Sequence, residues 1–420
     1  MTEILGEPRR GEAASTVPVD DSRRLLWSLG AAQLGLSIAF GAVPSVLLAL
    51  QVERAVGDDD KAVVLAIITT IGALAGMITQ PVVGALSDRT RNRRGRRAPW
   101  MLRGVLLALP LLALMGLTES MVVLGVLFAL TEAAFAMAQG PLVAVLPDRV
   151  PFRARGRFSA VTGLGIMIGT ITGQGVAAVF SDHLTVAYVV VGVIPLALML
   201  LLVRLSPDGD TTSALPQPLA LREVLAGYWL SPREHPDFAW AFLSRLLTYT
   251  GFFMVYGYTL YILDDFVGLG DDAVDKVPLV LLVAGVGICA STVPAGMLSD
   301  RLGRRKIFVL ISSAGIGVAF MVPVLVDDMT GIFVMFAIAG VAFGFYTAVD
   351  QALITEVLPR AASYGQDIGI VNMASALPQV LAPALAGGVV VAADYGALFP
   401  AGAVLTILGG LAILPIRSVR

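Results

Sequence analysis

Charged side chains are scarce in this 420-residue chain. Asp, Glu, Lys and Arg together make up 14% of it, hydrophobic residues make up 57%, and the mean hydropathy is +0.83. A water-soluble domain of this length needs far less apolar material to fill its core. The composition therefore excludes a soluble protein and predicts one whose solvent is a lipid bilayer.

Three other residue types are nearly absent, and each absence excludes a function. The single cysteine, Cys289, permits no intrachain disulfide, and the two histidines lie too far apart in sequence for a metal centre. None of the three lysines is followed by serine or threonine, which excludes a phosphate loop and a nucleotide-driven pump. We expect no enzyme activity, no metal or cofactor, no nucleic acid and no obligate protein partner.

Apolar runs long enough to cross a membrane recur along the whole chain. A hydrocarbon core of about 30 Å takes roughly 20 helical residues to cross, and unpaired backbone amides in lipid exclude irregular structure. We expect an all-α integral membrane protein with twelve transmembrane helices, near residues 25–50, 62–86, 98–117, 121–146, 158–181, 184–204, 238–263, 276–298, 306–326, 331–355, 367–390 and 395–416.

One sequence pattern, Gly-x-Leu-Ser-Asp-Arg, occurs after the second expected helix of each half. The copies begin at Gly84 and Gly296, and arginines follow both. Two copies of one membrane unit are typical of a transporter. The predicted parts are a cytoplasmic tail, two six-helix bundles joined by a proline-rich linker, and a short cytoplasmic end, at residues 1–24, 25–204, 205–237, 238–416 and 417–420. Within the linker, residues 219–230 fit an interfacial helix or a poorly ordered tether.

The basic residues are distributed asymmetrically between the two sides of the expected bundles. Of the 29 lysines and arginines, Arg54, Lys61 and Lys276 fall in outer loops, Arg103 and Arg245 fall within helices, and the remaining 24 lie on the side that holds both termini. Positively charged loops stay in the cytoplasm. The sequence therefore predicts a multi-pass protein of the cell membrane with both termini inside.

The repeated loop is similar to the signature of the major facilitator superfamily, and the resemblance extends over residues 25–416. The longer first loop, from Ser87 to Trp100, looks like the branch that contains sucrose transporters and glycoside-pentoside-hexuronide cation symporters. The segment 146–157, with Asp148 and Arg149, points to the same branch. The resemblance implies two pseudo-symmetric six-helix bundles that work by alternating access.

The resemblance also implies that the repeated loops form a conformational latch. Its predicted members are Gly84, Asp88, Arg89, Asp148, Gly296, Asp300 and Arg301. The glycines are expected where helices approach closely. Asp88 is expected to accept hydrogen bonds from arginines or to face the start of the eleventh helix near Gln366, where Asp367 competes for the same amides.

Three charged residues fall inside expected helices that line the central cavity of the resembled fold: Glu132, Arg245 and Asp350. Each costs roughly 3 kcal/mol if left without a partner at the membrane centre, so each should face water or an opposite charge. Arg245 and Asp350 lie at similar depth and are expected to pair. Glu132 has no cation at its depth, and a carboxyl in a partly apolar cavity takes up a proton readily, as a coupling site requires. The alternative is a carboxyl that is hydrogen-bonded to a neighbouring helix and has no coupling role.

Polar and aromatic residues at helical spacing are the candidates for the substrate cavity. They are Gln33, Gln139, Tyr249, Tyr256, Gln351, Asn372 and Gln379. A polyol binds to such a lining, where amides and hydroxyls hold its oxygens and an aromatic ring covers its apolar face.

The preferred function is secondary active transport of a sugar, glycoside or similar small polar solute by symport with protons across the bilayer. Gly165, Gly169, Gly173 and Gly175 partly resemble the glycine-rich motif of proton-coupled drug exporters. Export of a drug or secondary metabolite by antiport is therefore the alternative. A receptor or scaffold without flux is a further alternative, which the intact loops and buried charges disfavour.

Overall fold

The computed structural model describes residues 19–57, 60–151, 154–212, 233, 235–357 and 364–416, and these residues form helices and their connections without a strand. Within these ranges, ten helices are long and apolar enough to span a membrane. Two shorter apolar helices, Ala376–Ala392 and Tyr395–Leu411, cover the positions of the last two expected spans. The predicted all-α membrane fold is confirmed. Residues 219–230, the possible interfacial helix, lie outside the described residues.

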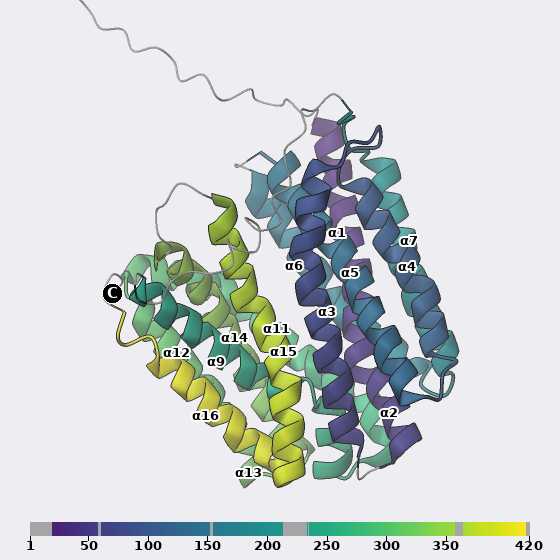
Figure 1. Cartoon of the computed structure of the whole chain (residues 1–420). Helices are drawn as coiled ribbons and strands as arrows, with labels where there is room; N and C mark the ends of the chain where they lie inside the picture. The colour runs from purple at the N-terminus through teal and green to yellow at the C-terminus, as the bar shows by residue number, and fades with distance from the viewer. Residues whose placement is uncertain are drawn as a thin grey trace, which may run out of the picture.

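The first half of the chain forms one bundle of six spans (Figure 1). Its first span consists of three consecutive pieces, and the other five are single helices. The elements are α1 (Val19–Ala42), the π-helical η1 (Val43–Leu47), α2 (Leu48–Val56), α3 (Lys61–Arg89), α4 (Ala98–Met115), α5 (Met121–Arg149), α6 (Arg155–Val179) and α7 (Leu184–Leu205).

The second half forms the other bundle, and its first span is again divided into pieces. The elements are α9 (Pro236–Tyr256), α10 (Thr259–Tyr261), the π-helical η3 (Ile262–Phe266), the short η4 (Gly270–Asp272), α11 (Ala273–Leu302), α12 (Arg305–Phe320), α13 (Val322–Leu325), α14 (Met329–Val357), α15 (Tyr364–Ala392), η5 (Tyr395–Ala397) and α16 (Leu398–Leu411).

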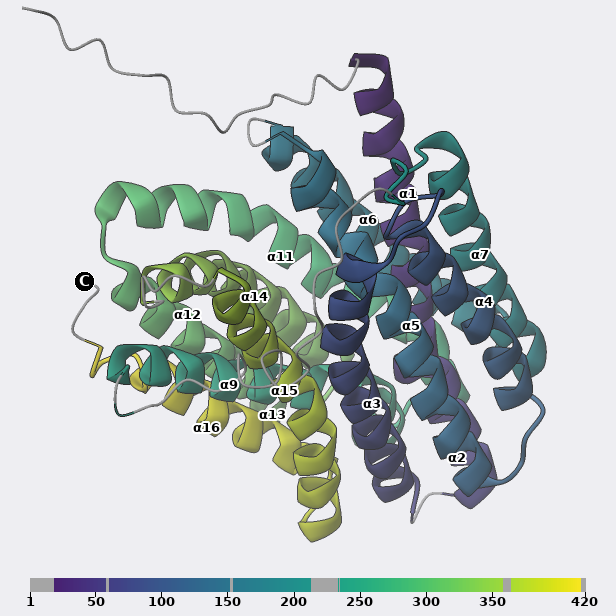
Figure 2. The ribbon, with the colours of Figure 1, turned by 45° about the horizontal axis from the view of Figure 1, so that its top comes forward.

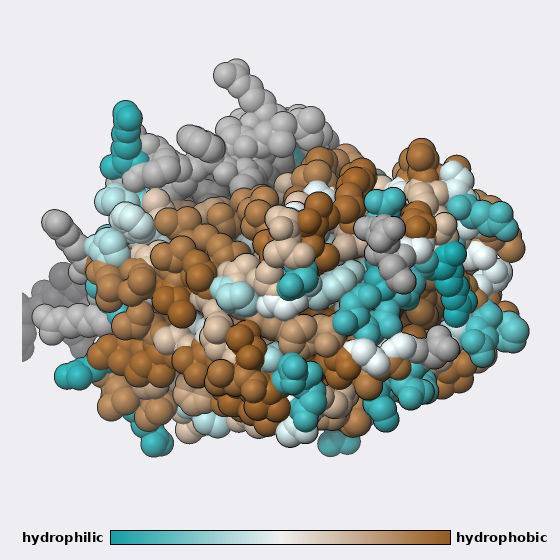
Figure 3. All heavy atoms as spheres, turned by 90° about the horizontal axis from the view of Figure 1, so that it is seen from below, coloured by the Kyte–Doolittle hydropathy of each residue, from teal (hydrophilic) through white to brown (hydrophobic). Residues whose placement is uncertain are grey.

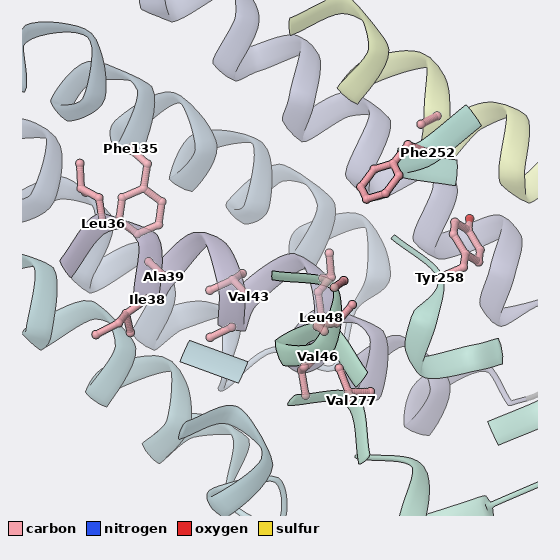
Figure 4. Close-up of a cluster of buried hydrophobic side chains, with 14 of the residues drawn as sticks. Leu36, Ile38, Ala39, Val43, Val46, Leu48, Phe135, Phe252, Tyr258 and Val277 are labelled. Atoms are coloured by element: carbon pink, nitrogen blue, oxygen red, sulfur yellow. The ribbon is translucent and has the colours of Figure 1, made fainter. Parts of the chain in front are cut away.

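The two bundles converge at one end of the molecule and diverge toward the other (Figures 1 and 2). We call the convergent end, which carries Lys61 and η3, the Lys61 end. The opposite end carries the loop between α3 and α4 and is called the arginine-rich end. Buried apolar side chains fill the contact near the Lys61 end, where Val46 and Leu48 belong to the same buried cluster as Val277 of α11 (Figure 4).

Large apolar side chains are exposed on the outer surfaces of both bundles. Examples are Ile78, Val122, Val179, Ile311 and Leu325. Continuous apolar surface of this extent is not stable in water, and acyl chains are its natural cover. In the view from below, onto the Lys61 end, hydrophobic residues are interspersed with hydrophilic ones (Figure 3).

The first span of each half is interrupted near the Lys61 end. In the first half, Pro44 lies in η1, where its missing N–H disturbs the helical ladder. In the second half, α9 ends at Tyr256, and Gly257 leads into α10 and the second π-helical segment. Interruptions at corresponding positions of two repeated halves are a pointer to the binding site of a transporter.

Glycines of α6 bring this helix against α1 with almost no gap. A Cβ at Gly173 would overlap the carbonyl oxygen of Ile38, and one at Gly169 would overlap that of Leu34. Small residues allow backbones to approach in membrane bundles, where van der Waals contact is a main source of helix association. Packing against α1 therefore explains Gly165, Gly169 and Gly173, although not Gly175.

Replacing Gly173 with alanine is expected to destabilise the protein by about 1–3 kcal/mol, because the added methyl group forces α1 and α6 apart. The measurement is the thermal unfolding midpoint of detergent-solubilised protein. Gly175→Ala is the matched control on the same helix, since no described atom lies within 4 Å of a Cβ there. Equal midpoints for the two variants would contradict the packing argument.

Candidate functional site

A cavity of about 560 Å³ lies between the two bundles. Both interrupted spans contribute to its wall, together with α3, α5, α6 and α15. The lining residues are Phe40, Gly41, Pro44, Ser45, Leu65, Thr69, Ala73, Gly76, Met77, Gln80, Phe128, Glu132, Ala136, Gln139, Thr170, Gln174, Phe253, Tyr256, Gly257, Tyr258, Ala376, Gln379 and Pro383. Its volume is in the range that holds a small molecule.

Glu132 of α5 is the only charged side chain among the described residues of the cavity wall. Its carboxylate lies beside α3, where a Cβ at Gly76 would be 3.8 Å from Oε2. No hydrogen bond or ion pair joins it to another described residue. Among the described residues, the carboxyl therefore has no polar partner and is open to the cavity.

Amide and aromatic side chains supply most of the remaining polarity and shape of the wall. Of the residues predicted for the cavity, Gln139, Tyr256 and Gln379 line it. Gln33 does not line it: it is buried behind Gln139, and its Nε2 lies 3.5 Å from Oε1 of that residue. Gln351 and Asn372 lie in α14 and α15, but their side chains are outside the described part of the structure.

Arg245 and Asp350 form an ion pair inside the second bundle, with 2.5 Å between Nε and Oδ2. Their side chains are 1% and 0% exposed. The hydroxyl of Tyr346 lies 3.4 Å from the other carboxylate oxygen, and the guanidinium carbon is 5.8 Å from the ring centre of Tyr249.

The expected pairing of Arg245 with Asp350 is present, whereas Tyr249, which was predicted for the substrate cavity, does not line it. Two opposite charges in hydrogen-bonding contact compensate part of each other's dehydration, so neither needs water. Tyr249 packs against the pair and against Phe343, with ring centres 5.2 Å apart, instead of facing the cavity.

At the arginine-rich end, Arg97 holds the first loop together. Its Nη2 lies 2.6 Å from Oδ1 of Asp88, and its Nε lies 2.9 Å from Oδ2 of Asp148. Arg96 also contacts Asp148, at 2.8 Å. The Arg97 side chain is only 7% exposed, whereas Asp88 is 50% exposed. These contacts lie within the first bundle, and the Gln366 side chain that was expected to face Asp88 is outside the described structure.

The remaining predicted latch residues are described only in part. Arg89 donates to the carbonyl of Ala85, Arg301 is exposed, and the side chain of Asp300 is not among the described ones. A Cβ at Gly84 or Gly296 meets no described atom within 4 Å. In this conformation the bundles diverge at this end, and neither glycine is in close contact with a described helix (Figure 2).

At the opposite end, Lys61 joins the two bundles. Its ammonium group lies 2.8 Å from Glu53 of the first bundle, and 3.0 and 2.9 Å from Asp264 and Asp265 of the second. The side chain is 1% exposed, and the ring centre of Tyr261 lies 5.0 Å away.

Two backbone contacts reinforce this closure. The Tyr261 hydroxyl donates to the carbonyl of Ala49, and the Tyr258 hydroxyl donates to that of Ala62. The cavity is thus closed at the Lys61 end.

Sequence reasoning missed three residues that the structure makes prominent: Lys61, Arg97 and Gln174. Lys61 was counted as an outer-loop charge, although two adjacent acids, Asp264 and Asp265, end the seventh span at the same depth. Arg97 was one of several loop arginines with nothing to distinguish it. Gln174 stands among the glycines of the fifth span, where nothing in the sequence singles it out, yet it lines the cavity.

The fold and the cavity define a membrane transporter built from two repeated bundles. Residues 60–416 match the family described as MFS/sugar transport protein, and the chain belongs to this family. It is therefore a secondary transporter in the membrane and not an enzyme. A segment of 36 residues is also 56% identical to an uncharacterised symporter of Synechocystis sp., a local match that covers 9% of this chain and 7% of that protein.

Solved structures of the same fold are similar over nearly the whole chain. The nucleoside transporter NupG has a TM-score of 0.75 at 12% identity, covering 94% of this chain and 100% of that one. A bacterial homologue of the human lysosomal transporter Spinster, in an inward-facing and unoccupied conformation, has a TM-score of 0.67 at 13% identity, covering 95% and 96%. At these identities the likeness establishes the fold.

Removing one member of the Arg245–Asp350 pair is expected to cost about 3–5 kcal/mol, because the other charge is left buried without compensation. Asp350→Asn should therefore lower the thermal unfolding midpoint strongly in detergent, whereas Asp88→Asn at the half-exposed pair should change it little. The double variant Arg245→Met with Asp350→Leu should recover part of the loss. Equal effects of Asp350→Asn and Asp88→Asn would show that the pair is not the buried contact described.

Proposed function

We propose that the protein imports a neutral, polar, ring-bearing solute, such as a sugar, a glycoside or a nucleoside, by symport with protons across the cell membrane. Glu132 carries this proposal: it is the one charged group on the described cavity wall and has no described partner. An acid in this position links proton binding to the occupancy of the cavity. The family and the symporter relative support symport, and the likeness to NupG, a nucleoside transporter, adds nucleosides to the candidate solutes.

The arginine-rich end is proposed to face the cytoplasm, since it carries most of the basic residues. The structure then corresponds to an inward-facing state, in which the Lys61 cluster closes the outer entrance. In the outward-facing state, the bundles separate at Lys61 and approach at the repeated loops. Gly84 and Gly296 would then provide close contact between helices, and Asp88 and Asp300 would form the latch with Arg89 and Arg301.

The direction of proton movement tests symport against export. Purified protein in liposomes with a luminal pH dye should acidify the lumen when a transported neutral solute, such as methyl glucoside or uridine, is added outside. Proton antiport would make the lumen alkaline. No dye response to either solute, with protein incorporation verified, would reject the proposed coupling to these substrates.

Glu132→Gln is expected to abolish accumulation of the solute against its gradient, because an amide does not take up the coupling proton. Exchange of labelled for unlabelled solute should persist, since exchange needs no net proton transfer. Both are measured in proteoliposomes under an imposed pH gradient. Glu119→Gln, in the exposed connection between α4 and α5, is the control and should accumulate solute normally. Normal accumulation by Glu132→Gln would remove this carboxyl from the mechanism.

Lys61→Met is expected to open the outer entrance, because the carboxylates of both bundles then repel each other. The reporter is Ser45→Cys on the cavity wall in a Cys289→Ser background, labelled with a membrane-impermeant maleimide. In right-side-out vesicles, labelling of the cysteine at position 45 should be several-fold higher in the Lys61→Met variant than in the same protein with Lys61 retained.

Lys276→Met, which removes an exposed lysine from the start of α11, should leave the labelling unchanged. Unaltered labelling of the Lys61 variant would show that its ion pairs do not hold the gate.

A further inference from the structure

Gln174 of α6 is a buried amide at the cavity that makes no hydrogen bond to a described residue. It lines the cavity, its side chain is 1% exposed, and neither Oε1 nor Nε2 has a hydrogen-bond partner among the described residues. Leaving a buried amide unsatisfied is costly, so proteins seldom retain one without a reason.

The helix that carries Gln174 has little freedom to turn the amide away from the cavity. Gly169 and Gly173 press α6 against the backbone of α1 at Leu34 and Ile38. Thr170, one turn earlier on α6, lines the cavity too. The amide is therefore held at a fixed position on the wall, which is typical of a pre-organised ligand-binding group.

The part of the wall across from Gln174 belongs to the other bundle and includes Tyr256 of α9. A ring bound beside them would contact both bundles at once, near the interrupted parts of the first spans. The glutamine amide supplies one acceptor and two donor hydrogens, and the tyrosine supplies a hydroxyl and an aromatic face. Vicinal hydroxyls of a sugar or the amide edge of a nucleobase match this combination.

The charge of the wall limits the class of ligand further. Away from the ends of the expected spans, the sequence contains two basic residues, Arg103 and Arg245. Arg245 is paired with Asp350, and Arg103 is exposed on α4 beside Trp100. An anionic solute would meet Glu132 without a counter-ion, so the wall favours neutral solutes over anionic ones.

We propose that Gln174 is a specificity-determining residue that hydrogen-bonds a neutral, ring-bearing solute within the cavity, and that the wall rejects its anionic analogues. This proposal rests on the proposed import function and assigns the recognition of the solute to one residue.

Gln51 of α2 gives a matched control for the substitution, because it is a buried glutamine whose amide nitrogen and oxygen both have hydrogen-bond partners. Its Nε2 donates to the carbonyls of Met115 at 2.7 Å and Thr118 at 3.0 Å, and its Oε1 accepts from the Tyr188 hydroxyl at 2.9 Å. Gln51→Leu should lower the unfolding midpoint of the ligand-free protein. Gln174→Leu should leave it unchanged or raise it, since an unsatisfied amide is replaced by an apolar group of similar size.

The transport arm measures exchange of methyl glucoside, uridine and methyl glucuronide in liposomes. The intact protein should exchange at least one of the two neutral solutes and should discriminate against the glucuronide. Gln174→Leu should raise the concentration of the neutral solute that gives half-maximal exchange about tenfold. This is the effect expected from the loss of one or two hydrogen bonds to the solute.

Two kinds of failure are distinguishable. If the intact protein exchanges neither neutral solute, the proposed function falls, and the role of Gln174 within it falls too. Suppose instead that the intact protein is active. Only the role of Gln174 is then overturned if Gln174→Leu has the same half-saturation concentration as the intact protein, or if it destabilises the protein as Gln51→Leu does. Equal exchange of the glucuronide and the neutral solute would overturn the rejection of anions.

Discussion

The dehydration of charge in lipid is the constraint on which this structure depends. A hydrocarbon core offers no hydrogen bonds, so an ionised side chain there needs an opposite charge or access to water. The chain uses both solutions. Arg245 and Asp350 satisfy each other inside one bundle, whereas Glu132 faces the cavity between bundles. A charge that faces water remains available for exchange with a proton, and one that is locked in a pair is a structural element.

Lys61 forms ion pairs at the boundary between the bundles. Its ammonium group has three hydrogens and three carboxylate neighbours, one from its own bundle and two from the other. Such a contact is strong only while the bundles are together, because separation leaves the acids of the second bundle without their cation. The first arginine-rich loop behaves differently, since its described ion pairs with Arg97 remain inside one bundle and do not oppose separation at that end.

The two halves share a backbone plan but not a chemistry. Both contain the interrupted first span and the same loop after the second span. The cavity acid belongs to the first half, while the buried ion pair belongs to the second. Repetition thus supplies two surfaces that close on each other, and the differences between them determine which residues meet the solute.

The sequence by itself determined the solvent, the helices and the repeat, because apolar runs, loop arginines and a recurring motif are properties of local segments. It also gave the partnership of Arg245 with Asp350, since few charges lay at that depth. Only the tertiary structure decided which side chains face the cavity: Gln139 and Tyr256 do, whereas Gln33 and Tyr249 lie behind the wall. Lys61, Arg97 and Gln174 likewise owe their importance to neighbours distant in sequence. Helical spacing fixes the face on which a residue lies, but the tilt of one bundle against the other decides what that face meets.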